Sequence, residues 1–544
     1  MTALGYIWGP TFEEYHTHVF EPHPSKLVDA EIAEFFEEHD SLLPLNCVET
    51  SLAYFDPRID NVGFISQFGL SDIAAMLRKY LTQSKDKVRI QCINSIFKHY
   101  YGFLCARYLL HIACLSVLRQ TSIQDEILDS LPRNASWAQF SQSIVFAALD
   151  KASEALANDE SLEDLVSVVT GFFATGLDIE DVLFIITELW RDRDSLLTLC
   201  MDGMLPGCSL LLLSSMEVLP TEVNESTYKT YMYLQGLSFR LFLVGSHRDR
   251  QLLQPVCMFT PENDIDWPDD FEGYVDSADS QIITDAYFGL VAVWQETFNT
   301  EILPIDLAIR LDRFILKTAA RNTEMRSHNL ILTLHTSFRL LWLIFEHRGR
   351  IPVDDHINIR DYAITVFVFL EILQLRRICT DEDQYMLARM LADIELIALA
   401  GRILLLVMYE GCNFEDTYLL NSFLDQLKKL GDAISYSAGV APELFNESKT
   451  EWCKVANHMT SYDKEVAGPI NAPGSSEAEC LWRMFEAWAV WSPLLNISQC
   501  SSPARCAYPR CFETIHKLPD MVKAQYACGR CNKVAYCNLV CQRA

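Results

Sequence analysis

Three cysteine pairs near the C-terminus are the residues of this 544-residue chain whose types and spacing could do chemistry. They are Cys506 and Cys511, Cys528 and Cys531, and Cys537 and Cys541. Cysteines separated by two to four residues, taken two pairs at a time, are the usual ligands of a tetrahedral zinc ion. Thiolate ligation also supplies folding energy to a segment too small to bury its own core. The tail therefore predicts a zinc-binding module.

The distances between the pairs restrict how they could share zinc. Sixteen residues separate Cys511 from Cys528, whereas five separate Cys531 from Cys537. Four ligands taken in order from Cys528 to Cys541 would make a cramped site. An interleaved arrangement, in which the first and third pairs share one zinc and the middle pair reaches a second, relieves the crowding. Four thiolates leave no open position, so such a zinc is structural rather than catalytic.

Within this tail the sequence resembles a MYND-type zinc finger, with the spacing of the first pair similar to fungal members. The matching residues are Cys506, Cys511, the segment Cys528-Gly-Arg-Cys531, the segment Lys533-Val-Ala-Tyr-Cys537, and Cys541-Gln542-Arg543. The resemblance implies that Cys506, Cys511, Cys537 and Cys541 form one complete zinc site. It implies that Cys528 and Cys531 belong to a second site, which in the family is completed by a His and a Cys farther along.

The second site is expected to be incomplete in this chain. The sequence ends at Ala544, before the Trp, His and Cys of the family's final segment, and we expect it to be cut short there. His516 and Cys500 are the candidate substitutes for the missing ligands. The expected cofactor is therefore one zinc in the complete site, with a second site weak or empty.

The resemblance implies a protein–protein interaction scaffold or regulator, whose partner could be a proline-containing peptide. It covers about 36 of the 544 residues. Two alternatives stay open: a SET/MYND-like protein methyltransferase, because SET-domain enzymes carry the same finger, and a ubiquitin-ligase adaptor, because cross-braced zinc modules recur there. No nucleophile elbow, phosphate-binding loop or H-E-x-x-H motif is present, so nothing in the sequence supports catalysis.

Composition and charge narrow the class further. Half of the residues are apolar, so a large core can be buried, and the net charge of −29 disfavours a nucleic-acid binder despite a mildly basic tail. Residues 1–10 lack a secretory signal, and the apolar runs are short or interrupted by residues such as Arg107 and His111. We expect an intracellular protein of the cytoplasm or nucleus, not a membrane protein, with reduced cysteines such as Cys47, Cys92, Cys105 and Cys114 serving as small apolar side chains.

The elements that carry this tail are predicted to be helical. Val145, Leu149, Ala152 and Leu156 follow the spacing of one helical face, and Leu387, Leu391, Ile394 and Ala398 repeat it behind a Thr380-x-x-Asp383 start. Short breaks such as 219–225 separate the helices. The predicted fold class is all-α: a long helical array, either a solenoid with armadillo- or HEAT-like packing possible or an irregular bundle, with a small C-terminal zinc module.

The predicted organisation has an N-terminal mixed segment (1–60), a helical domain (61–491), a linker (492–505) and a partial MYND-type zinc finger (506–544). Within the helical domain, residues 260–280 carry eight acids and no base. This segment is interpreted as a solvated loop between two helical halves, with a docking motif for a basic partner as the alternative. His16 and His18 are interpreted as a solvated, hydrogen-bonded pair, with metal binding as the alternative.

Overall fold

The computed structural model describes the helical elements of most of the chain. The described residues are 8–17, 44–53, 70–82, 95–131, 136–156, 178–218, 225–259, 276–297, 305–322, 325–346, 359, 362–367, 369–370, 380–409, a few positions between 424 and 455, 526–527 and 535–536. The six predicted zinc ligands lie outside them, as do Cys92, His18, the linker 492–505 and most of the acidic segment. Among the described residues every element except one short strand pair is helical, which confirms the all-α prediction.

The chain divides into two compact units, Met1–Tyr274 and Val275–Ala544. The division falls inside the predicted acidic loop 260–280. That loop ends earlier than expected, because α16 (Ser277–Thr297) already includes residues 277–280. Asp276 starts this helix: its side chain accepts from the backbone N–H of Ala278, and its carbonyl accepts from that of Ser280, both at 2.9 Å. An acidic residue at this position satisfies the unpaired N–H groups of a first helical turn.

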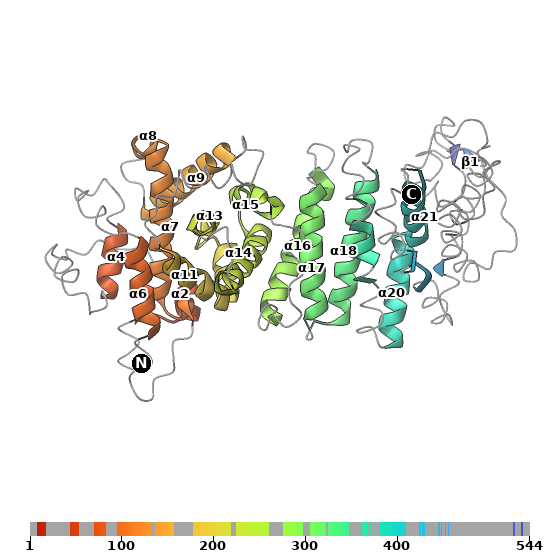
Figure 1. Ribbon diagram of the computed structural model, residues 1–544, viewed down its shortest axis with the longest axis horizontal. Coiled ribbons are helices and arrows are strands. Elements are labelled where there is room, and N and C mark those ends of the chain that lie inside the picture. Colours follow the sequence, from red (N-terminus) through yellow and green to blue (C-terminus); the bar gives the residue numbers. More distant parts are fainter. Residues whose placement is uncertain are drawn as a thin grey trace. The chain divides into compact units, whose positions relative to one another are not determined.

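The first unit is built around α7 (Tyr100–Gln120), whose side chains are buried over most of its length. The other elements of this unit are α2 (Phe12–His16), α4 (Leu45–Ala53), α6 (Leu70–Thr82), the 3₁₀ turn η1 (Ile96–Lys98), α8 (Gln124–Ser130), α9 (Trp137–Leu156), α11 (Ile179–Arg191), α12 (Arg193–Met201), α13 (Cys208–Val218), α14 (Glu225–Val244) and α15 (His247–Phe259) (Figure 1). Helices α4, α6, α9 and α13 all pack on α7. The predicted break at 219–225 matches the end of α13 and the start of α14.

Helix α9 carries the first predicted apolar face. Val145, Leu149, Ala152 and Leu156 are all buried, and this helix packs against α7 and α15. Cys47, Cys105 and Cys114 are buried free thiols, as expected for cysteines that serve as small apolar side chains. Repeating apolar residues on one helical face thus predicted the buried surface correctly, because that face is the part of the helix that excludes water.

Helix α7 is the single helix in the described part of the chain that is long and apolar enough to cross a membrane. In its most apolar window, 83% of the residues are buried within the protein. Its interior position accounts for its composition, because a helix surrounded by others is apolar on every side.

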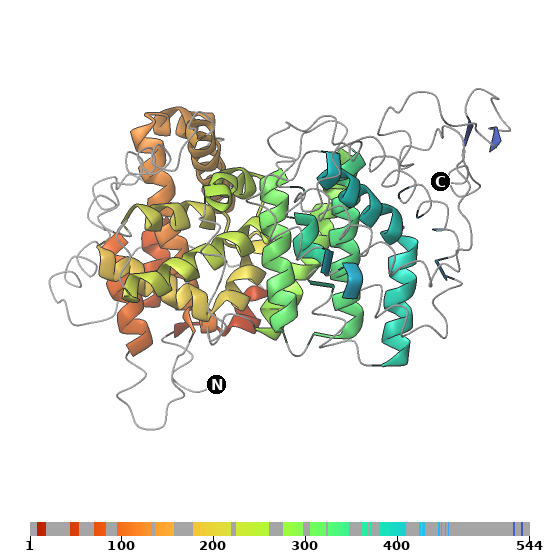
Figure 2. The same cartoon turned by 45° about the vertical axis from the view of Figure 1, so that its right-hand side comes forward.

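In the second unit, helices α16, α17 (Ile305–Arg321) and α18 (Ser327–Glu346) pack against one another and run side by side (Figures 1 and 2). Helix α20 (Asp381–Asp393) packs on α18, and α21 (Leu396–Tyr409) packs on α20. The predicted Thr380 cap is confirmed: its side chain accepts from the backbone N–H of Asp383 at 3.1 Å.

The second predicted apolar face crosses a break between two helices. Leu387, Leu391, Ile394 and Ala398 are all buried, as expected for one face. However, α20 ends at Asp393, and Glu395 has a positive φ of 55° before α21 begins. A left-handed residue cannot continue a right-handed helix, so the chain changes direction here while its apolar side chains still face the core.

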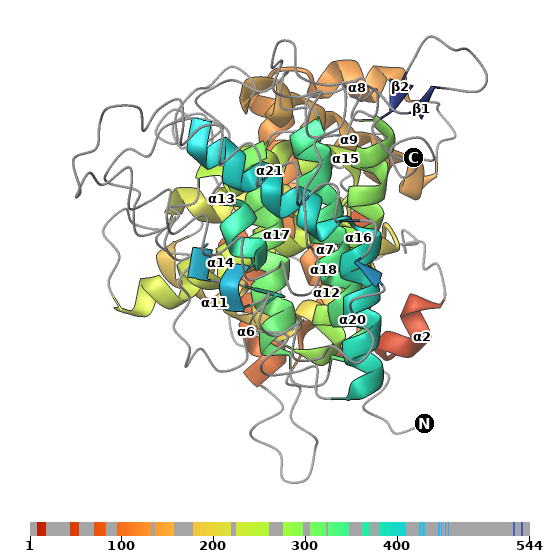
Figure 3. The ribbon, with the colours of Figure 1, turned by 90° about the vertical axis from the view of Figure 1, so that its right-hand side faces the viewer.

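Near the C-terminus, strand β1 (Tyr526–Ala527) pairs with β2 (Ala535–Tyr536) in an antiparallel arrangement, and the two lie side by side in Figure 3. Tyr526 is opposite Tyr536, and Ala527 is opposite Ala535. The pair therefore closes a hairpin around residues 528–534.

Candidate functional site

The predicted zinc ligands are located relative to the β1–β2 pair by the sequence alone. Cys528 follows β1 directly, Cys531 belongs to the connection between the strands, and Cys537 follows β2 directly. In the part of the chain that the structure describes, no three His, Cys, Asp or Glu side chains gather as potential metal ligands. Among the described residues, a cavity in the first unit has the features of a binding site.

This cavity has a volume of about 490 Å³ and is lined by residues from seven helices and their connections. Helices α2, α7, α9, α12, α13, α14 and α15 contribute to its wall, together with the turns that follow α12 and α14. Its size falls within the range of small-molecule sites, which combine apolar walls with a few polar groups. The polar residues of its wall include His16, Arg107, Asp202, Ser209 and Asp249.

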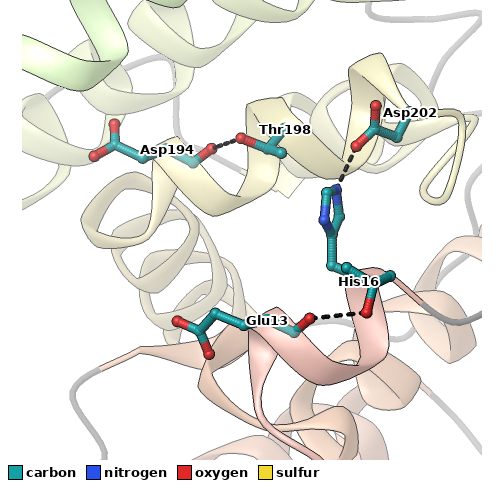
Figure 4. A network of polar contacts seen from close by, with 6 residues as sticks. Glu13, His16, Asp194, Thr198 and Asp202 are labelled. Carbon is teal, nitrogen blue, oxygen red and sulfur yellow. Dashed lines mark hydrogen bonds and ion pairs between the residues drawn. The ribbon is translucent and has the colours of Figure 1, made fainter.

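His16 and Asp202, two residues of the cavity wall, are joined by a hydrogen bond (Figure 4). The His16 Nε2 atom contacts the Asp202 carboxylate, which joins α2 to the end of α12. Helix α2 is short, but Thr11 and Glu14 form a capping box at its start, and the Tyr15 hydroxyl donates to the Phe97 carbonyl at 2.6 Å. The interpretation of His16 as a hydrogen-bonded residue is confirmed.

Local hydrogen bonds hold the two helices that carry this pair, as the dashed lines in Figure 4 show. The Thr198 hydroxyl of α12 donates to the Asp194 carbonyl at 2.9 Å, and Thr17 donates to the Glu13 carbonyl at 3.1 Å. Each bond satisfies a side-chain hydroxyl within its own helix. The backbone N–H of Asp202 donates to the Thr198 carbonyl at 3.0 Å, which fixes this residue to the end of α12.

A second carboxylate in the wall, that of Asp249, is fully hydrogen-bonded. Its two oxygens accept from the Ser209 hydroxyl at 2.6 Å and from the Ser246 hydroxyl at 2.7 Å. The Ser246 side chain in turn accepts from the Asp249 backbone N–H at 3.2 Å, which caps the start of α15. Asp249 thus connects α13 to α15 and has a donor for each oxygen.

Arg107 of α7 and Ser141 of α9, which both line the cavity, are hydrogen-bonded to a histidine that is not part of its wall. His111 is buried; its Nδ1 atom donates to the Arg107 carbonyl and its Nε2 atom accepts from the Ser141 hydroxyl, both at 2.7 Å. Burial first, and the nearby Arg107 charge second, lower the pKa of His111 to about 4. The imidazole is therefore uncharged at neutral pH, and Arg107 is the positive group of this wall.

Two thiols face each other beside the turn that follows α12. The Sγ atoms of Cys200 and Cys208 are 3.6 Å apart, and the Cys208 thiol donates to the Leu205 carbonyl at 3.3 Å. Gly203 and Gly207 have positive φ values of 67° and 87°, which glycine adopts readily in so tight a turn. The contact with Cys208 and burial raise the pKa of Cys200, so the protonated, weakly nucleophilic form dominates.

The cavity was not predicted from the sequence. Its signal was present in part, since Arg107 and His111 are the polar residues that interrupt the apolar run of α7. Their types show that one side of the helix meets polar groups, but which other helices complete the wall depends on the tertiary packing.

Comparisons with known proteins leave the family of the chain open. No protein-family model matches the sequence, and neither a curated protein nor a solved structure matches the chain.

Proposed function

We propose that this protein is an intracellular, helical interaction scaffold whose C-terminal cysteine module binds structural zinc and contacts a protein partner. The observation that supports it most directly is the β1–β2 pair, which brackets Cys528 and Cys531 and precedes Cys537. A hairpin whose connection holds a Cys-x-x-Cys sequence suits zinc ligation, because the paired strands keep the two ends of the cysteine-bearing turn together.

The donor set fits zinc. Cys506, Cys511, Cys537 and Cys541 would hold one ion, and Cys528 and Cys531 would contribute to a second, incomplete site. Bound zinc supplies folding energy to the tail and no catalytic water, because four thiolates leave no open position. The proposed role is therefore binding rather than catalysis.

The partner in this proposal is a protein, with a proline-containing peptide as the candidate ligand. The two compact units are built of packed helices, whose outer surfaces are available to a protein partner in this proposal. The buried free thiols of the first unit, among them Cys105 and Cys114, suit a reducing intracellular compartment of the cytoplasm or nucleus.

Metal analysis of the purified full chain tests the zinc site. We expect about one tightly held zinc per chain, since four thiolates complete one site. Cys537→Ser should release that zinc and leave the helical circular dichroism nearly unchanged. Cys200→Ser, which removes a thiol in the first unit, is the matched control and should keep the zinc.

Two results would contradict the proposal. Absence of zinc from the unmodified chain would contradict the proposed zinc site. Equal zinc content in the Cys537→Ser variant would show that other residues bind the metal. Binding of a panel of proline-containing peptides, measured by fluorescence anisotropy with and without the Cys537→Ser change, tests the partner class. Peptide binding that survives loss of zinc would separate the partner from the zinc module.

A further inference from the structure

Arginines stacked on aromatic rings recur in the first unit, and two of them show the usual arrangement. The Arg78 guanidinium lies 4.9 Å from the centre of the Phe184 ring and pairs with Asp181 at 2.7 Å. Arg248 lies 4.5 Å from the centre of the Phe146 ring and pairs with Asp150 at 2.6 Å. In both cases the ring covers one face of the cation while a carboxylate accepts from its edge.

Arg107 has the aromatic contacts without the carboxylate. Its guanidinium lies 4.4 Å from the centre of the Trp137 ring and 5.5 Å from that of Phe103. Within the part of the chain that the structure describes, no carboxylate lies within 4.0 Å of it, and the only charge effect on its pKa comes from Tyr100. Arg107 instead forms part of the cavity wall.

Arg107 is charged in this position. Burial lowers its pKa to about 10, which still leaves the guanidinium protonated at neutral pH. Among the described residues, the guanidinium contacts ring faces and no carboxylate. Planar guanidinium groups donate best to carboxylate or phosphate oxygens. A carboxylate or phosphate oxygen could therefore reach the Arg107 guanidinium from the cavity.

The two carboxylates of the wall already have hydrogen-bond donors other than Arg107. Asp202 is paired with His16, and both oxygens of Asp249 already accept from serine hydroxyls. Apolar side chains, including Phe146, Met204 and Leu241, line the same cavity. The wall thus offers one cation with unused donors next to an apolar surface.

We propose that this cavity binds a small organic anion, with its carboxylate or phosphate on the edge of Arg107 and its apolar body along the cavity wall. A volume of about 490 Å³ accommodates a ligand of this kind. The net charge of −29 disfavours unspecific anion binding, so saturable binding would indicate a defined site.

Isothermal titration calorimetry of the full chain with phenyl phosphate and with phenylacetate tests the site and distinguishes the two anion types. Saturable binding of at least one is expected, with phenol and inorganic phosphate each binding more weakly. Arg107→Gln should weaken binding more than about tenfold, because a hydrogen-bonded charge is lost. Arg248→Gln is the matched control and should bind like the unmodified protein, because that stacked arginine already has a carboxylate.

A measurement on the unmodified protein covers the case in which Arg107→Gln does not fold. Phenylglyoxal modifies accessible arginines, and peptide mass spectrometry can follow Arg107 and Arg248 separately. Phenyl phosphate or phenylacetate should protect Arg107 and leave the labelling of Arg248 unchanged. The proposal is overturned if neither compound binds saturably, if Arg107→Gln binds as tightly as the unmodified protein, or if Arg107 labelling is unaffected by saturating ligand.

Discussion

Asp312 of α17 is a buried carboxylic acid whose ionisation should make the second unit less stable as the pH rises. The residue has no exposed surface. Its Oδ1 atom accepts from the Tyr287 hydroxyl and, at 2.6 Å, from the Ser337 hydroxyl, while Oδ2 has no hydrogen-bond partner among the described residues. Burial raises the pKa of Asp312 from 3.8 to about 6, against the opposing effects of the neighbouring hydroxyl groups and of the Arg313 charge.

The sign of the effect follows from this direction. Because the folded protein holds the proton more tightly than the unfolded chain, the stabilisation is fully present below pH 3.8 and is lost as the pH rises through about 6. A shift of this size corresponds to about 3 kcal/mol of unfolding free energy. Above pH 6 the folded protein carries a buried carboxylate with one oxygen unsatisfied.

Asp312→Asn tests this reasoning, because asparagine keeps an oxygen for Tyr287 and Ser337 but does not ionise. At pH 4.5 the variant should be less stable by about 1–3 kcal/mol, since its amide N–H groups replace an oxygen that has no partner. Between pH 4.5 and 8 the unmodified protein should lose about 2 kcal/mol that the variant does not lose, because the remainder of the stabilisation is already lost at pH 4.5. The gap between the two proteins should therefore shrink or reverse.

The assay is urea unfolding of the full chain followed by circular dichroism across this pH range, with hydrogen exchange in α17 peptides as the local measurement. Asp285→Asn, on the exposed side of α16, is the matched control and should follow the unmodified protein at every pH. A gap between Asp312→Asn and the unmodified protein that stays constant from pH 4.5 to 8 would refute the ionisation of Asp312 as described here.

Three further predictions, on a close backbone approach, a helix cap and a buried histidine, can be checked by urea unfolding of the full chain. Gly102→Ala should lower the unfolding free energy by at least about 2 kcal/mol, because its Cβ would lie 1.9 Å from the Ile96 carbonyl oxygen. Gly289→Ala, whose Cβ would have no atom within 4 Å, should raise the unfolding free energy by about 0.5–1 kcal/mol. Equal effects of the two changes would contradict the close approach at Gly102. Asp178→Ala should cost about 1 kcal/mol, since this side chain caps α11 by accepting from the Asp181 N–H at 2.7 Å; an unchanged midpoint would contradict the cap. The lowered pKa of His111 stabilises the folded protein above pH 6.5, and this stabilisation is lost as the pH falls. Acidification from pH 6.5 to 4 should therefore lower the unfolding free energy by up to about 3 kcal/mol through His111. His111→Gln should remove that part of the loss.

The local sequence determined the helices and much of their buried faces. Val145, Leu149, Ala152 and Leu156 repeat at helical spacing and are buried in α9, and Thr380 caps α20 as its spacing from Asp383 indicates. Such features are predictable because they depend on residues within a few positions of one another. The ends of the elements are harder to predict: the acidic run 260–280 predicts a loop throughout, whereas α16 begins at Ser277.

The cavity and its charges depended on tertiary structure. Arg107 and His111 stood out in the sequence as polar interruptions of an apolar helix, but their roles are set by residues far along the chain. Burial between helices keeps His111 neutral, the Ser141 hydroxyl donates to its Nε2 atom, and Trp137 covers one face of Arg107. The sequence by itself determined that the chain is helical and that its cysteine tail has the spacing of zinc ligands. Only packing between α7, α9, α13 and α15 decided which polar side chains share one cavity, because burial and charge pairing arise between elements rather than within them.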